Sequence, residues 1–446
     1  MRQHINTFTQ GDAMLSISKR VEAVMPDVIR NRRDFHKYAE AAWTEFRTAS
    51  IVAGKLQALG YRVTLGRDAV NEKDMMGVPS PGEMKKHQER ALAQGADPAL
   101  VEKMRGGFTG LWADMDFGGD GPAFAFRFDM DANDVIESDS PDHRPMKEGF
   151  ASVNHGAMHA CGHDAHTAMG LAVAEILVSL KDQLKGRVRL IFQCAEEGCR
   201  GALSMVTAGC VDGIDQLVGA HIGFKAAHKG AIVCGVTSFL ASVKMDVLYK
   251  GKSAHAGAAP QEGRNALLAA CAATTNMHAI ARNGNGPTRI NVGKLIGGQG
   301  RNVIPPEALV VFETRGETTE LNDYMLAEAM RILEAAGAMW GCAFETKVMG
   351  NAGSCRSSDA IVARAANIAK TMPAYAEVVD SMDFGAGEDV SHMMERVMEN
   401  GGQATYVQLG VDKAAGHHNE RFDFDEQGLM PGIEFLVRLA FDYLQR

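Results

Sequence analysis

The eight residues from His159 to His166 bring one thiol, three imidazoles and a carboxylate together in the order His-Ala-Cys-Gly-His-Asp-Ala-His. Cys161 and His163 are close enough in a turn to bind one ion. Thiolate suits zinc, and imidazole suits zinc, manganese and other first-row metals. A His-rich surface loop with an inert cysteine explains this stretch equally well when it is taken alone, because short motifs often match by chance.

Further candidate ligands stand directly after apolar segments or in a Gly-flanked loop near the C-terminus: Glu196, Glu197, His221, His417 and His418. Strand ends on one edge of an α/β sheet are the usual place for functional side chains, so these residues are expected to lie together. In an adjacent acid pair one carboxylate can bind metal while the other acts as general base.

The expected ligand set is Cys161, His163, Glu197, His221 and one of His417 and His418. Five mixed ligands exceed the four of one tetrahedral zinc. They predict two divalent ions that share a bridging group and hold a water between them.

The elements that would position these ligands alternate between apolar strands and amphipathic helices. This order is typical of an α/β fold with a mostly parallel central sheet flanked by helices. The predicted strands are 61–65, 108–113 paired with 123–128, 187–193 and 216–220. The predicted helices include 18–38, 47–59, 169–180 and a last helix that begins near residue 425.

The pattern changes near residue 238. Residues 242–250 alternate with period two, as an antiparallel strand at a sheet edge would. Helices at 265–281 and 321–336 alternate with strands at 289–295 and 308–314, which indicates a smaller α+β domain. We expect residues 1–237 and 352–446 to form the larger domain and 238–351 to be inserted in it.

Two other segments differ from this scaffold. Residues 66–107 contain a charged stretch of helical period from 83 to 105, and they are interpreted as a surface insertion. Residues 1–13 are expected to be a loose leader, which leaves Met14 as an alternative start.

Composition excludes several classes of protein. The chain has 446 residues, long enough for two domains, and a net charge of -9 argues against broad nucleic-acid binding. The sequence contains neither a membrane-length apolar run nor an apolar signal segment near its start, so we expect a cytoplasmic protein without a membrane partner. Its eight cysteines are expected to be mostly buried thiols.

Three motifs together resemble the amidohydrolase branch of the dinuclear metallo-aminopeptidase and carboxypeptidase superfamily: residues 159–166, Phe-Gln-Cys-Ala-Glu-Glu-Gly at 192–198, and Gly-Lys-Ser-Ala-His-Ala-Gly at 251–257. The resemblance extends from Arg32 to Glu426. The insertion and the segments 106–110, 313–316 and 416–420 resemble a subfamily that cleaves p-aminobenzoyl-glutamate.

The resemblance implies a catalytic domain with an inserted lid and dimerisation domain. It implies two metal ions, manganese or zinc, with Cys161 bridging them and Glu196 as the base. The spacing to Phe422 implies His418 as the last ligand, with His417 kept as the alternative.

Other implied roles lie outside the metal ligands. His255 would reach the active site of a partner chain, where it would polarise the scissile carbonyl. Asn302 and Arg315 would bind the free carboxylate of the substrate. Asp131 would either orient a metal ligand or cap its strand end.

The expected function is therefore a metal-dependent amidohydrolase for N-acyl amino acids, with p-aminobenzoyl-glutamate as the specific substrate. A broader N-acyl-amino-acid deacylase or dipeptidase is the alternative within the same class. A non-catalytic binding protein within a hetero-oligomer is the alternative outside it. The partners would be a small-molecule substrate and a second chain, either another copy or a related B subunit.

Overall fold

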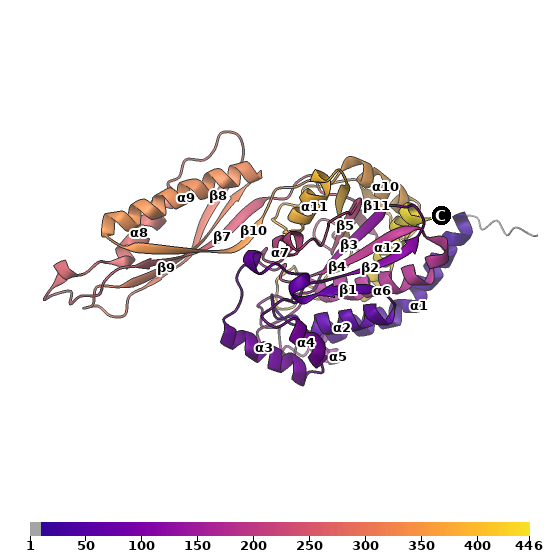
Figure 1. Ribbon diagram of the computed structural model, residues 1–446, viewed down its shortest axis with the longest axis horizontal. Helices are drawn as coiled ribbons and strands as arrows, with labels where there is room; N and C mark the ends of the chain where they lie inside the picture. Colours follow the sequence, from indigo (N-terminus) through magenta and orange to yellow (C-terminus); the bar gives the residue numbers. More distant parts are fainter. Residues whose placement is uncertain (1–9) are drawn as a thin grey trace, which may run out of the picture.

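The chain folds around two separate β-sheets, each with its own apolar core (Figure 1). The computed structural model describes residues 10–446. The first helix, α1, begins at Gln10, earlier than the expected residue 18. Residues 10–13 are therefore helical rather than a loose leader, and residues 1–9 of that expectation lie outside the described part.

The larger sheet has eight strands in the order β1-β2-β4-β3-β5-β12-β6-β11. Parallel pairing joins β3 to β4 and β5, β5 to β12, and β6 to β11, which confirms the mostly parallel sheet. The strands are β1 (Arg62–Leu65), β2 (Leu111–Gly118), β3 (Ala123–Asp129), β4 (Gly186–Gln193), β5 (Gln216–Ile222), β6 (Ala231–Val233), β11 (Glu377–Val379) and β12 (Gln403–Leu409).

The predicted pairing of the second and third strands is wrong. β4 lies between β2 and β3, antiparallel to the first and parallel to the second. The short link between β2 and β3 is typical of a hairpin, but β4 is almost entirely buried, and only an interior place in the sheet covers both of its faces.

Helices cover both faces of this sheet. α6 packs on β3 and β4, with α1 and α12 against it, while α11 packs on the other face over β5 and β12, with α7 beside α11. α6 is apolar on nearly all sides and buried along most of its length, as expected of a central helix. The helices of this part are α1 (Gln10–Lys37), α2 (Phe46–Ala58), α5 (Arg144–Glu148), α6 (His163–Ser179), α7 (Ala202–Thr207), α10 (Asp359–Lys370), α11 (Val390–Glu399) and α12 (Leu429–Leu444).

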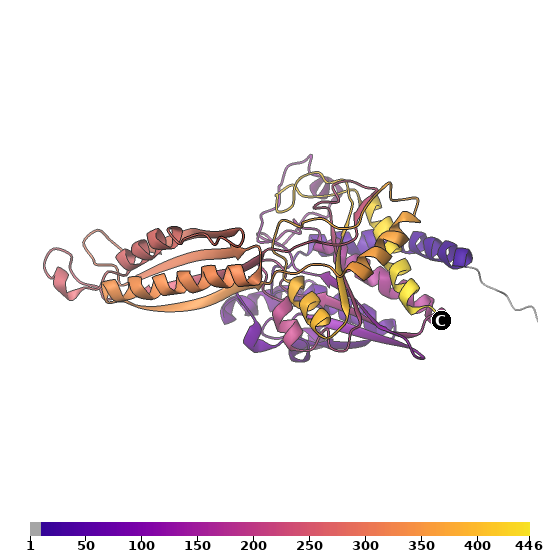
Figure 2. The ribbon, with the colours of Figure 1, turned by 90° about the horizontal axis from the view of Figure 1, so that it is seen from above.

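The smaller sheet is antiparallel, in the order β10-β7-β9-β8, and projects from the larger part of the molecule (Figures 1 and 2). We call this sheet and its two helices the lid. Both helices cover one face of the sheet, where alternate side chains of β7 are buried, and the other face is left open. The elements are β7 (Ala241–Lys250), β8 (Thr288–Gly297), β9 (Glu307–Gly316), β10 (Ala343–Ala352), α8 (Ala266–His278) and α9 (Thr319–Trp340).

The predicted edge position of β7 is wrong, because β7 lies between β10 and β9. The edges are β8 and β10. β10 has charged, mostly exposed residues, which hid it from the sequence pattern. The lid falls within the predicted insertion, whose boundaries at 238 and 351 stay a prediction.

The charged segment 83–105 is two helices rather than one: α3 (Pro81–Ala93) and α4 (Pro98–Lys103). Asp97 caps α4 and Pro98 is its first residue, so the break has a local cause. Among residues 10–446, none of the helices has the length and apolar character needed to span a bilayer.

Candidate metal centre and active site

The candidate residues meet at the carboxyl ends of β3, β4 and β5. These neighbouring strands run parallel, so the loops that follow them open on one edge of the sheet. α6 begins at that edge with His163, after Gly162 in the left-handed conformation (φ 95°). A side chain at Gly162 would come within 2.5 Å of Ile222, so the loop requires glycine here.

The imidazoles of His163 and His221 both use Nδ1 for a backbone contact, which leaves Nε2 free in each ring. Nδ1 of His163 is 2.9 Å from the backbone oxygen of Asp131, and Nδ1 of His221 is 2.8 Å from that of Ile222. An N–H at Nδ1 donates to each carbonyl, which leaves Nε2 of both rings as an electron-pair donor. This is the tautomer that a metal ligand needs.

Cys161 is a member of two groups of residues that could each hold a metal ion. One is Cys161, His163 and His221, and the other is Cys161, Glu197 and His418. Nε2 of His163 and Oε1 of Glu197 are buried without a hydrogen-bond partner, and they lie 3.9 Å apart. Buried polar atoms of this kind cost free energy unless something binds them, so the donor set fits bound metal cations.

The two adjacent histidines, His417 and His418, have different surroundings. The ring of His417 stacks on Phe224 with centroids 4.2 Å apart, and its Nε2 accepts from the Phe224 N–H. Its Nδ1 lies 3.7 Å from the Cys161 sulfur. His418 instead places Nε2 3.5 Å from Oε1 of Glu197. The geometry therefore groups His418 with Glu197 and places Nδ1 of His417 beside the sulfur of Cys161.

Two buried carboxylates hold the turn that carries the acid pair. Oε1 of Glu45 accepts from the N–H of Ala195 at 2.7 Å. The two oxygens of Asp131 accept from the N–H groups of Glu196 at 3.0 Å and Glu197 at 2.8 Å. Ala195 has a positive φ of 50°, a strained conformation that these bonds help to maintain. Asp131 thus supports the acid pair rather than only capping β3, and Glu45 was not found from the sequence.

Glu196 has the surroundings of a proton acceptor. Burial raises its pKa well above the usual range, and the nearby carboxylates of Glu388 and Glu197 raise it further. Glu388 is itself held by Arg127 at 2.9 Å and by the Tyr406 hydroxyl at 3.0 Å. A carboxylate with a raised pKa is better matched to general-base work near neutral pH.

A cavity of about 360 Å³ joins this cluster to the base of the lid. The cluster forms one side, and Ser242, Lys244 and Arg315 of β7 and β9 form the other. Phe224 and Phe384 give the cavity an aromatic wall, with ring centroids 4.8 Å apart. A small molecule with an aromatic and an anionic part matches these surroundings.

His255 and Asn302 do not line this cavity. Both follow strands at the far end of the lid, where the Ala256 N–H donates to the backbone oxygen of Asn302 at 3.0 Å. β7 has ten residues, so its two ends are about 30 Å apart. The structure therefore brings Arg315 to the candidate metal ligands of its own chain but leaves His255 and Asn302 away from them.

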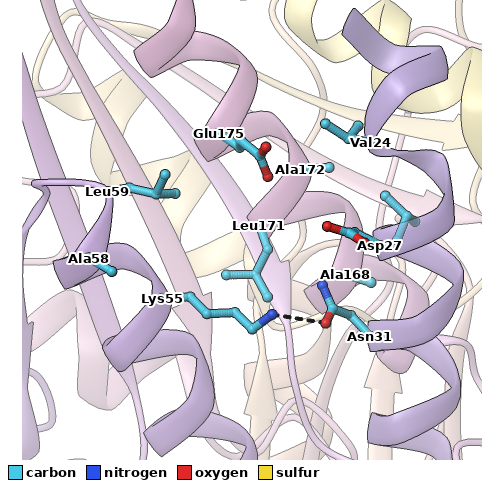
Figure 3. Close-up of a pocket in the computed structure, with 11 residues that line it drawn as sticks. Val24, Asp27, Asn31, Lys55, Ala58, Leu59, Ala168, Leu171, Ala172 and Glu175 are labelled. Carbon is cyan, nitrogen blue, oxygen red and sulfur yellow. Dashed lines mark hydrogen bonds between the residues drawn. The ribbon is translucent and has the colours of Figure 1, made fainter.

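A second cavity, of about 230 Å³, lies between α1, α2 and α6 (Figure 3). Leu59, Leu171 and neighbouring alanines line part of it, and the charged side chains of Asp27, Lys55 and Glu175 line the rest. Lys55 donates to Asn31 at 3.0 Å. None of the candidate site residues lines it, so it is separate from the metal centre.

The site combines carboxylates, imidazoles and a thiol at the carboxyl edge of a mostly parallel sheet, and it faces the base of an α+β lid. This arrangement is that of a hydrolase with candidate metal sites. The chain belongs to peptidase family M20/M25/M40, whose family model matches residues 125–442.

Individual relatives are similar over nearly the whole chain. The A subunit of p-aminobenzoyl-glutamate hydrolase from Escherichia coli (strain K12) is 46% identical, covering 96% of this chain and 99% of the relative. Indole-3-acetyl-aspartic acid hydrolase of Enterobacter agglomerans is 45% identical, covering 96% and 98%. The crystal structure of an aminobenzoyl-glutamate utilization protein from Klebsiella pneumoniae has a TM-score of 0.84 at 38% identity, covering 96% and 98%. The expected resemblance is confirmed, and the chain is an amidohydrolase, an enzyme that cleaves amide bonds.

Proposed function

We propose that the enzyme hydrolyses the amide of an aromatic acyl group attached to an acidic amino acid. p-Aminobenzoyl-glutamate, which would give p-aminobenzoate and glutamate, is the first candidate substrate. Indole-3-acetyl-aspartate is the second, because a relative named for it is 45% identical against 46% for the first. Both molecules combine an aromatic ring with two carboxylates, which agrees with the aromatic wall and the cations of the cavity.

The proposed metal ligands are Cys161, His163, Glu197, His221 and His418. Two divalent ions, manganese or zinc, would polarise the scissile carbonyl and the attacking water. Glu196 then takes a proton from the water as its oxygen attacks the carbonyl carbon. The same proton passes to the amide nitrogen when the carbon–nitrogen bond breaks, so the products are a carboxylic acid and a free amine.

The lid would complete the site. Arg315 binds a carboxylate of the amino acid from within the same chain. His255 and Asn302 would come from the lid of a partner, either a second copy or a related B subunit, since the Escherichia coli relative is named as an A subunit. Nδ1 of His255 accepts from the N–H groups of Gly257 and Ala258, so the neutral ring carries its proton on Nε2 and can donate to the carbonyl oxygen.

The observation that carries this proposal is the pair of ligand groups that share Cys161 beside Glu196. Its test is a panel of substrates with the metal-loaded protein: p-aminobenzoyl-glutamate, indole-3-acetyl-aspartate, hippurate and a neutral dipeptide. We expect one of the first two to have the highest kcat/KM, and activity to disappear on chelation and return with manganese or zinc. Equal rates on all four substrates would instead favour the broader deacylase. A cytoplasmic location stays a prediction of the sequence.

A non-catalytic binding role predicts a different result from the same samples. Purified protein would then bind substrate without turnover, with or without a B subunit. Elemental analysis showing about two ions per chain, together with turnover by the chain alone, would exclude this alternative.

A further inference from the structure

Lys244 is a half-buried cation that lacks a counter-ion among the described residues. It lies on the open face of β7, at the end of the lid nearest the metal ligands, and it lines the cavity with them. Its Nζ lies 3.6 Å from the sulfur of Cys199, a weak acceptor. Within residues 10–446, none of the carboxylates forms an ion pair with it. A partly desolvated ammonium of this kind attracts an anion that enters the cavity.

The other cation of the cavity, Arg315, is already partnered. Its guanidinium donates to both carboxylate oxygens of Glu313, at 2.9 and 3.1 Å. Lys244 and Glu313 are cross-strand neighbours on β7 and β9, yet the carboxylate of Glu313 pairs with Arg315 and not with Lys244. In the part of the chain that the structure describes, the cavity therefore contains one neutralised cation and one free cation.

The charges in the cavity are also separated in space. Glu196, Glu197 and Glu388 lie on the side of the larger domain, whereas Lys244 and Arg315 lie on the side of the lid. A substrate whose amide faces the metal ligands can therefore direct its amino-acid part towards the lid. An acidic amino acid has two carboxylates in that part. Lys244 is free to bind one of them, and Arg315 can bind the other if its guanidinium is shared with Glu313 or released from it.

We propose that Lys244 is a specificity-determining residue that binds the side-chain carboxylate of the substrate's amino acid. This inference rests on the proposed function and deepens it, because it explains why glutamate or aspartate is preferred over a neutral amino acid. Arg315 then binds the carboxylate common to all amino acids. The flexible lysine stem lets one ammonium reach side chains of both lengths.

The test compares p-aminobenzoyl-glutamate with p-aminobenzoyl-glutamine, which has the same shape but a neutral side chain. We expect wild-type kcat/KM to be higher for the glutamate compound by roughly 10- to 100-fold, the usual range for a hydrogen bond to a charged group. Lys244→Met keeps the aliphatic stem and should remove most of that preference, mainly by raising KM for the glutamate compound. Lys244→Arg should retain most of it.

The matched control is Lys250→Met on the same strand. Lys250 lies at the far end of β7 and pairs with Glu345, outside the cavity, so this variant should keep the wild-type preference. Metal content and thermal unfolding, measured for every variant, identify any that fail to fold. Calorimetry with free glutamate and free glutamine gives a second readout without turnover, and Lys244→Met should weaken glutamate binding selectively.

The possible outcomes separate this inference from the proposed function. If wild type hydrolyses neither compound nor any other of the aromatic acyl amino acids, the proposed function fails and the inference fails with it. If wild type hydrolyses both at equal rates, or if folded Lys244→Met keeps the preference for glutamate, only the role of Lys244 is overturned. Arg200 lines an adjoining cavity together with Lys244. A loss of preference in an Arg200→Met variant, with the preference kept in Lys244→Met, would assign the role to Arg200.

Discussion

Hydrogen bonds determine which ring nitrogen is free in three histidines of the candidate metal centre. His163 and His221 donate to backbone oxygens through Nδ1 and keep Nε2 for a metal, whereas His417 uses Nε2 to accept from the backbone. Burial and the nearby ammonium of Lys413 lower the pKa of His417 to about 3, so its ring stays neutral. The adjacent residues His417 and His418 therefore have different contacts.

The first prediction separates His417 from His418. His418→Ala should leave about one ion per chain even with metal in excess, because the site near Glu197 loses a ligand. His417→Ala should bind about two ions with metal in excess, although with an affinity lower by roughly 10- to 100-fold, as is usual when a supporting contact is removed. Elemental analysis across a metal titration measures both.

A reversal of these two results, with His417→Ala losing an ion and His418→Ala keeping both, would exchange their roles. Wild type supplies the reference occupancy in the same titration.

The sequence could predict the residues with a recognisable spacing, and the structure brings all the proposed metal ligands and Glu196 to one edge of the sheet. Glu45 and Lys244 could not be found in this way. Glu45 lies far in sequence from the motifs, and Lys244 lies on a predicted strand but outside any motif. Each matters only through a contact that folding creates. Asp131 was found, but its two alternatives could be separated only by its bonds to the acid pair.

At the scale of elements, a buried ionic network joins α1 to the start of α6 and to the C-terminal loop. Arg32 of α1 forms ion pairs with Asp164 at 2.9 Å, Asp423 at 3.0 Å and Glu426 at 3.3 Å. Asp164 follows His163 directly, and Asp423 comes shortly after His418. The network therefore fixes two ligand-bearing segments relative to each other.

The second prediction concerns the stability of this network in acid. Burial alone would raise the pKa of Asp164, but the Arg32 guanidinium and a hydrogen bond with His36 lower it below the usual range. A lowered folded-state pKa contributes stability above pH ~4, the unfolded value, and that contribution is lost as the pH falls further. Asp164→Asn should cost about 3 kcal/mol of unfolding free energy at pH 7. It should also lose less stability than wild type on acidification.

Chemical unfolding at several pH values between 7 and 3 measures this effect. Asp359→Asn, which removes an exposed pair with Arg356, is the control and should follow wild type. All three proteins are measured free of metal, so that metal release in acid does not contribute and the difference between them reports on Asp164. Parallel curves for wild type and Asp164→Asn would show that this carboxylate does not carry the acid sensitivity.

The type of each element, helix or strand, could be predicted better than the order of the strands within a sheet. Period-two and helical patterns located most strands and helices, but they carry no information about which strand enters between two others. The predicted pair β2 and β3 is therefore separated by β4, and β7 is an interior strand of the lid sheet because β10 pairs with its free side. Charged, exposed strands such as β10 lack the apolar alternation on which such predictions depend.

At the scale of the whole molecule, the lid places part of the predicted site out of reach of its own metal ligands. Arg315 lies at the base of the lid, while His255 and Asn302 follow β7 and β8 at its far end. β8 and β10 are the open edges of the lid sheet and could pair with another chain. A dimer through the lids would let each chain supply its distal lid residues to the other.

The most direct test mixes two inactive variants, Glu196→Gln and His255→Ala. Each alone should lose roughly 10²-fold or more in kcat, since one lacks the general base and the other the donor to the carbonyl oxygen. Unfolded together and refolded at equal amounts, they should regain about a quarter of the wild-type rate, because half of randomly formed dimers are mixed and each mixed dimer has one intact site. If mixed dimers form, bind metal and remain inactive, the site is not assembled from Glu196 of one chain and His255 of another.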